Sequence, residues 1–224
     1  MRILLLLFIF SLSTSEKHAY IISSSAGDLP SAFHDVMTYS TIMKKIGYTT
    51  HYILDLTPNE MKSVDISENV YTNLNVLPQL LSSLTDRDEA IITLSSHGFL
   101  STFDSDYYIK FGNDVYTHST IMNWIYTSKA KTLVIIDTCH SGGICPVYLK
   151  PKDTSHITIL TSCSESEMDN DDISYLGFGG GLTTAIADYI NIHYVFSLND
   201  IDNIYKYCQE RLAKMNQHAR LIRV

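Results

Sequence analysis

Two short runs of apolar, largely β-branched residues bounded by turn residues, 90–94 and 132–136, together with four further runs typical of strands, constrain the fold of this chain more than any other feature. Such runs are typical of buried strands in a parallel sheet. Segments with helical spacing of apolar residues alternate with them, which predicts βαβ units and a mostly parallel sheet with helices on both faces. The expected strands are 18–23, 52–56, 90–94, 132–136, 157–160 and 219–224, and the expected helices are 33–46, 74–84, 119–128, 183–190 and 199–215.

The composition is that of a folded α/β protein. Of 224 residues, 45% are hydrophobic and 18% are charged, which excludes a disordered chain and is enough for a full core. The net charge is −8 and no run of basic residues occurs, which argues against nucleic acid as a partner. Residues 99–115 predict a hairpin, and no linker or repeat divides the chain, so one domain is expected.

The N-terminus predicts a secretory signal peptide over residues 1–15. Arg2 precedes the apolar run 3–10, and Ser13 and Ser15 supply small residues for cleavage near Ser15. The alternatives are a buried first strand or a membrane anchor, but the run is short for a membrane span. We therefore expect a mature domain of residues 16–224 in the secretory pathway, secreted or in a lysosome or vacuole lumen, with no stable membrane span.

Four cysteines are too few for a disulfide scaffold of this size. They are Cys139, Cys145, Cys163 and Cys208. One or two bridges are compatible with an oxidising lumen, and their pairing is open. If one cysteine is catalytic, at least one of the other three is unpaired.

Two segments that follow neighbouring predicted strands carry the chemistry. They are Ser95-Ser96-His97-Gly98 and Asp137-Thr138-Cys139-His140-Ser141-Gly142-Gly143. Sites form at the carboxyl ends of strands in open α/β sheets. A thiol and an imidazole placed together there make a nucleophile and its base. Cys139 and His97 are therefore the predicted catalytic dyad.

Each residue of the dyad also has a plainer interpretation. Cys139 could be an inert buried thiol and His97 a hydrogen-bonded turn residue. His140 is the rival base, although its place next to Cys139 directs it to the other side of the strand end. Gly98 leaves room for its N–H to face a substrate, so the Gly98 and Cys139 amides are the predicted oxyanion hole.

These segments resemble the caspase-like cysteine peptidases, which comprise caspases, metacaspases, legumains and the catalytic subunit of the glycosylphosphatidylinositol transamidase. The segment Asp137 to Gly142 is similar to the metacaspase catalytic segment. The signal peptide and the segments 174–177, 198–200 and 217–218 look more like legumains. The resemblance implies a caspase-like three-layer α/β sandwich with a mainly parallel six-stranded sheet.

The same resemblance suggests a substrate pocket. Asp137 shares a strand face with Cys139 and suits a Lys or Arg before the scissile bond, as in metacaspases, or the amide of Asn, as in legumains. Ser95 matches a metacaspase pocket serine. The plainer interpretation of Asp137 is a carboxylate that accepts backbone N–H bonds. The positions of the legumain pocket Arg and Asp correspond to Phe33 and Phe178.

Weaker signals lie in the loops after the fifth expected strand. Glu165 and Glu167 are candidates for substrate binding, with a solvated loop as the alternative. Asp169, Asp171 and Asp172 suggest calcium, but the run fails the EF-hand pattern. The cysteines and His140 make a poor zinc set. We expect no cofactor and no metal, with calcium as the exception to test.

Together these features predict a cysteine endopeptidase that acts on peptide or protein substrates. Cys139 would attack the carbonyl and His97 would move the proton. Two alternatives stay open. One is a transpeptidase that resolves the acyl-enzyme with an amine, and the other is a non-catalytic interaction domain on a peptidase fold.

Overall fold

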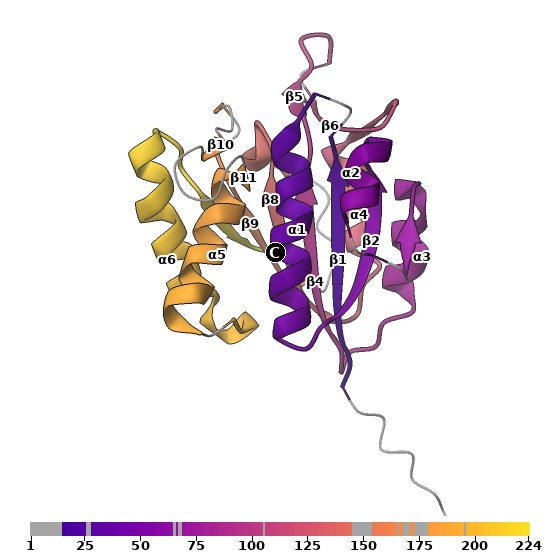
Figure 1. Cartoon of the computed structure of the whole chain (residues 1–224), viewed down its shortest axis with the longest axis vertical. Coiled ribbons are helices and arrows are strands. Elements are labelled where there is room, and N and C mark those ends of the chain that lie inside the picture. Colours follow the sequence, from indigo (N-terminus) through magenta and orange to yellow (C-terminus); the bar gives the residue numbers. More distant parts are fainter. Residues whose placement is uncertain are drawn as a thin grey trace, which may run out of the picture.

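A twisted, mostly parallel sheet forms the middle layer of the molecule in the computed structural model (Figure 1). The structure describes residues 15–25, 28–64, 66, 69–104, 106–144, 154–164, 166–167, 171–172, 179–194 and 196–224. Within these ranges the main sheet has the strand order β12-β9-β8-β4-β1-β2-β3, and β12 alone is antiparallel. Its strands are β1 Lys17–Ser24, β2 Thr49–Asp55, β3 Val70–Tyr71, β4 Glu89–Ser95, β8 Lys131–Asp137, β9 Ile157–Thr161 and β12 Arg220–Arg223.

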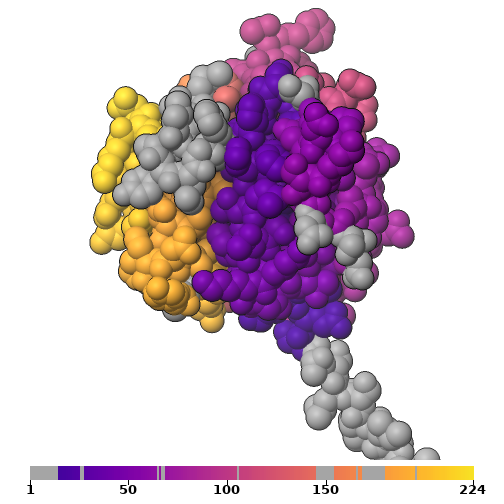
Figure 2. Space-filling view, viewed as in Figure 1, coloured from indigo at the N-terminus to yellow at the C-terminus, as the bar shows by residue number. Residues whose placement is uncertain are grey.

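Helices cover both faces of this sheet, each over its own apolar core. On one face lie α1 Pro30–Lys45, α5 Gly181–His193 and α6 Ile201–Leu212, which form much of the surface seen in Figure 2. On the other lie α3 Leu77–Ser82 and α4 His118–Ile125. The predicted three-layer α/β sandwich is confirmed. No helix in the described ranges has both the length and the apolar character needed to cross a bilayer.

All six predicted strands are present, but the expected strand count was one too low. The seventh strand is β3, two residues at the edge of the sheet, which is too short to leave a pattern in the sequence. The expected helix 74–84 is instead a 3₁₀ turn, Leu74–Val76, followed by α3. Pro78 explains the break, because its missing N–H and fixed φ suit the first turn of a helix and not its interior.

The region predicted as a hairpin is a three-stranded antiparallel sheet. Its strands are β5 Gly98–Leu100, β6 Tyr107–Phe111 and β7 Asp114–Thr117. The β5–β6 hairpin projects beyond the carboxyl edge of the main sheet, at the top of Figure 1. Because β5 starts at Gly98, directly after His97, this small sheet is joined to the predicted dyad.

The remaining elements are short. Helix α2, Pro58–Ser63, was not predicted, although Thr57 and Glu60 form a capping box that is visible in the sequence. The other short elements are β10 Asp171–Asp172, β11 Gly179–Gly180 and three 3₁₀ turns at Ser141–Ile144, Leu198–Asp200 and Ala213–Met215.

The core under α4 contains an unusual buried histidine. His118 is 1% exposed, and its ring nitrogens have no well-formed hydrogen bond among the described residues, although the Gly143 backbone lies close enough to oppose part of the effect of burial on its pKa. Its ring stacks on Tyr107, with centroids 5.6 Å apart. Burial lowers the pKa of His118 to about 4. The native state therefore holds this imidazole neutral at pH values where an unfolded chain protonates it.

We expect this histidine to make the fold sensitive to acid. Its pKa is depressed in the folded state, so its contribution is present above about pH 6.5 and is lost as the pH falls from there towards 4. His118→Phe keeps the stacked ring and removes the titration. The gap in unfolding free energy between the wild type and this variant should move by about 2 kcal/mol between pH 7 and 4.5, in favour of the variant. Urea unfolding at both pH values measures this, and a constant gap would contradict it.

Candidate active site

The structure brings the two predicted catalytic segments together at the carboxyl edge of the sheet. Strands β4 and β8 are parallel neighbours, and Ser95 is paired with Asp137 in their register. His97 and Cys139 each follow two residues later, in adjacent loops. The backbones of these loops touch, because a Cβ placed on Gly98 would lie 2.1 Å from the Cys139 carbonyl oxygen. Gly98 is thus required for the close approach of the two segments.

His97 has a carboxylate partner that the sequence did not reveal. Its Nε2 lies 2.9 Å from Oδ1 of Asp28, in the connection between β1 and α1. The hydrogen bond to His97 and its charge lower the pKa of Asp28, and nearby Lys110 adds to the effect. A carboxylate on one ring nitrogen fixes the tautomer and leaves Nδ1 to exchange a proton with a nucleophile.

Among the described cysteines, Cys139 alone is accessible. It is half-buried and forms no disulfide with another described cysteine, whereas Cys163 and Cys208 are fully covered. Burial raises the pKa of both the Cys163 and the Cys208 thiols, which disfavours the reactive thiolate. Cys145 lies outside the described residues. A nucleophile must be reachable by substrate, and Cys139 satisfies this condition.

The rival base, His140, contacts residues outside the predicted dyad. It has a left-handed φ of 57°, and its N–H donates to the Glu167 carbonyl oxygen at 2.9 Å. Its ring lies beside Tyr107 of β6, with centroids 6.5 Å apart. The amides of Gly98 and Cys139 remain the predicted oxyanion hole.

Beside the dyad, two carboxylates converge under the sheet edge on the α1 and α5 face. Oδ2 of Asp137 accepts hydrogen bonds from the N–H and hydroxyl of Thr183, both at 2.8 Å. Asp35 accepts from the Gly180 N–H at 2.9 Å and from the Ser95 hydroxyl. A Cβ on Gly180 would lie 2.4 Å from an oxygen of Asp137 and 3.0 Å from one of Asp35. The two acids therefore face the same small space.

Within this acid pair, one oxygen of Asp137 has a structural role and the other is an acceptor without a partner among the described residues. Asp137 holds the first turn of α5, which agrees with the plainer interpretation of this residue. Its other oxygen, Oδ1, is buried and has no partner among the described residues. Ser95 and Asp137 were predicted together, whereas Asp35 was missed. Asp35 follows Phe33 and His34 in α1 and is 1% exposed. The sequence pattern of this helix does not show that a carboxylate at this position is buried.

The remaining predicted pocket residues are placed less favourably. The Glu167 carboxylate accepts from the Ser164 N–H at 2.9 Å and contacts His218 Nδ1 at 2.5 Å. Partial burial opposes ionisation, but the bonds from Ser164 and His218 keep the pKa of Glu167 below its usual value. Glu167 therefore ties its loop to the chain before β12. Glu165 and Phe178 lie outside the described residues, and Phe33 packs against the core.

No metal site is visible among the residues that the structure describes, where no group of three or more His, Cys, Asp or Glu could hold an ion. Asp169 lies outside these residues, and Asp171 and Asp172 are described in backbone only. The calcium alternative is therefore untested.

Comparisons with known proteins support the fold. No family model and no curated protein matches the sequence. A Geobacter sulfurreducens protein, solved as a structural genomics target, matches with a TM-score of 0.64 and 13% identity over 93% of both chains. Caspase-1 of Spodoptera frugiperda matches with a TM-score of 0.62 and 12% identity over 93% of this chain and 85% of its own. The chain therefore has a caspase-like fold.

Proposed function

We propose that this protein is a cysteine endopeptidase that cleaves after a basic residue. The observation that carries the proposal is an accessible Cys139 in the loop next to that of His97, with Asp28 on the histidine, at the carboxyl edge of a caspase-like sheet. Peptide-bond cleavage needs a thiolate, a proton carrier and donors for the oxyanion. This edge offers candidates for all three.

The reaction follows from these positions. The Cys139 thiol gives its proton to His97, and its sulfur attacks the peptide carbonyl. The oxyanion that forms is held by the Gly98 and Cys139 N–H groups. His97 then protonates the leaving amine, and the peptide C–N bond breaks to leave a thioester. Water attacks the thioester with His97 as base, which releases the acid product and restores the thiol.

The preference for a basic residue before the scissile bond rests on the acid pair. Among the described residues Asp137 Oδ1 has no hydrogen-bond partner, and the Asp35 carboxylate faces the same small space. A cationic side chain would supply the missing hydrogen bond and offset two neighbouring negative charges. An Asn amide could donate to Oδ1 but would leave the charges uncompensated.

Turnover of peptidyl amides that differ only in the residue before the scissile bond tests this proposal. We expect turnover after Arg and Lys and little after Asn. In Asp137→Asn this preference should fall by about tenfold or more, because the carboxylate that pairs with the cation is lost. The rate of alkylation of Cys139 by iodoacetamide, which needs no pocket, should change far less. Cleavage after Asn with none after Arg or Lys would contradict the basic specificity.

We also propose that residues 1–15 direct the protein into the secretory pathway and are then removed. Strand β1 begins at Lys17, and the Glu16 N–H donates to Asp88 Oδ1 at 2.9 Å. Cleavage after Ser15 would therefore leave the sheet complete. It would also place a new α-ammonium group next to the Asp88 carboxylate.

A further inference from the structure

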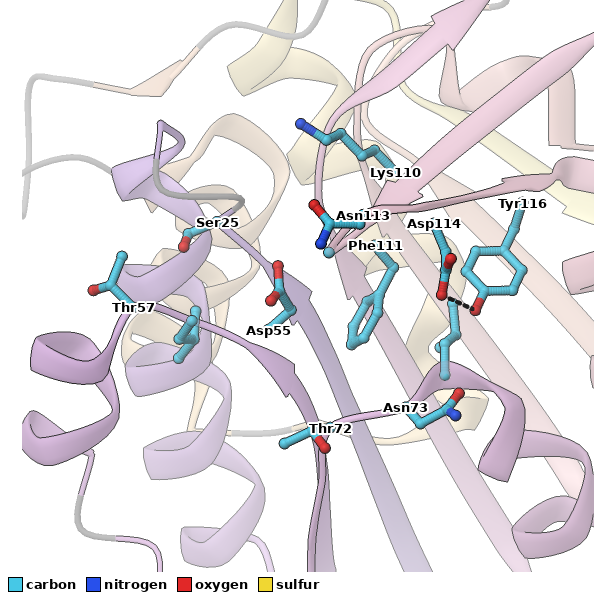
Figure 3. Close-up of a pocket in the computed structure, with 13 residues that line it drawn as sticks. Ser25, Asp55, Thr57, Thr72, Asn73, Lys110, Phe111, Asn113, Asp114 and Tyr116 are labelled. Atoms are coloured by element: carbon cyan, nitrogen blue, oxygen red, sulfur yellow. Dashed lines mark hydrogen bonds between the residues drawn. The ribbon is translucent and has the colours of Figure 1, made fainter.

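A cavity of about 670 Å³ opens at the carboxyl edge of the sheet, outside the acid pair and the dyad (Figure 3). It lies where β1, β2 and β3 end, beneath the β6–β7 turn. Its walls are mainly polar, with two carboxylates, Asp55 and Asp114, and one lysine, Lys110. Leu74 and Phe111 border its inner end, but these side chains are almost fully buried and present little apolar surface to the cavity. None of the predicted site residues lines this cavity.

The order of strands places this cavity on the leaving-group side of the proposed reaction. Cys139 follows β8, His97 follows β4, and Ser25 and Asp55 lie at the ends of β1 and β2. His97 must protonate the leaving amine, so the departing peptide lies on the His97 side of Cys139. From there the edge of the sheet leads over β1 to the cavity. The rim is joined to His97 directly, because the Lys110 N–H donates to the His97 carbonyl oxygen at 3.0 Å.

Asp55 carries the charge recognition. Its Oδ2 accepts from the Ser24 hydroxyl at 2.8 Å, and that hydroxyl accepts from the Gly112 N–H at 3.1 Å, which fixes the carboxylate. No hydrogen bond or ion pair from the described residues reaches Oδ1. In Figure 3 the Asp55 carboxylate points up into the cavity towards Asn113, whose amide nitrogen is turned to the same space. Asp55 is thus held in place with one acceptor free.

The charges around the cavity favour a cation. Asp114 is bonded only weakly, with Oδ2 3.5 Å from the Tyr116 hydroxyl. Lys110 makes no ion pair with Asp55 or Asp114 and lies at the rim, near Asp28. The cavity is therefore lined by two acids and one lysine, and the lysine pairs with neither acid. A long basic side chain that enters the cavity would bring its charge to Asp55.

We propose that this cavity binds a lysine or arginine side chain of the substrate, about four residues to the C-terminal side of the scissile bond. The proposal rests on the endopeptidase function above. Three strand spacings separate the ends of β8 and β2, which is about 14 Å. An extended peptide covers this distance in about four residues. The cavity thus selects proteins in which a second basic residue follows the cleavage site.

Two internally quenched peptides that are identical except for Lys or Glu at the fourth residue after the scissile bond test this proposal. In the wild type, kcat/KM should favour the Lys peptide by about tenfold, because Lys pairs with the Asp55 carboxylate whereas Glu is repelled by it. Asp55→Asn should reduce this ratio to near one, since Asn keeps the Ser24 hydrogen bond but loses the charge. Because the ratio is taken within each variant, a general loss of activity does not disturb it.

Asp86→Asn is the matched control. It removes one charge at an exposed position at the opposite end of the sheet, and the Lys preference should persist. Equal rates for the two peptides in the wild type, or an unchanged ratio in Asp55→Asn, would overturn the cavity assignment. A peptidyl amide that has a basic residue before the scissile bond and a single small amine as its leaving group separates the two proposals, because it has no residue that could reach the cavity. Cleavage of this substrate would support the endopeptidase function, whatever the cavity binds. If the enzyme does not cleave it, both proposals are overturned.

Discussion

Cys139→Ala should abolish peptide cleavage and labelling by a thiol-directed peptidyl electrophile. Removal of the nucleophile takes away the covalent route, and losses of about four or more orders of magnitude accompany such changes in peptidases. The other described thiols cannot replace it. Cys163 and Cys208 are covered, and burial raises the pKa of each. The fold should be retained, because Cys139 is half-buried in a loop and the substitution only removes volume.

Intact-protein mass spectrometry after incubation with the electrophile measures the labelling, and peptide turnover measures the activity. Cys145→Ala and Cys163→Ala are the controls, and both should be labelled once, as the wild type is. Loss of labelling in Cys145→Ala alone would show that the dyad is wrongly assigned. Labelling of Cys139 without any peptide turnover would favour the interaction domain on a peptidase fold.

The sequence was sufficient to predict the main sheet because each central strand is buried on both faces. Runs such as 90–94 and 132–136 are apolar apart from one threonine each, and a short run of this kind bounded by turns has few alternatives. The edges of the sheet were less predictable. Strand β3 has two residues and pairs on one side only, so its formation depends on β2 and not on its own sequence.

The candidate site was predictable where chain order determines position. Alternation of side chains along a strand placed Asp137 on the face of Cys139, and Ser95 was chosen through the metacaspase resemblance; the structure pairs these two residues in the strand register. Asp28 and Asp35 were missed for the opposite reason. Asp28 reaches His97 across 69 positions, and Asp35 reaches Ser95 across 60. No local pattern marks a loop or helix carboxylate as the partner of a residue that far away.

Gly98→Ala is expected to have the largest effect of any substitution that leaves the reacting groups in place. The new Cβ would lie 2.1 Å from the Cys139 carbonyl oxygen and 2.9 Å from the Thr138 hydroxyl. The first of these is a backbone atom, which cannot rotate away, so the two loops must separate. A shift of about 1 Å in a catalytic group costs about 100-fold in rate. Overpacking of this kind also costs about 1–3 kcal/mol of stability.

Gly47→Ala is the informative control for this prediction. Gly47 has a φ of +84° and no atom within 4 Å of its Cβ position, so alanine there strains the backbone without a clash. It should lower the free energy of unfolding by about 1 kcal/mol and leave kcat/KM per folded molecule unchanged. Gly98→Ala should lower both quantities, as measured by urea unfolding and peptide turnover. Wild-type kcat/KM in Gly98→Ala would mean that the contact between the two loops does not position the dyad, and the oxyanion hole assigned to Gly98 would lose its structural basis.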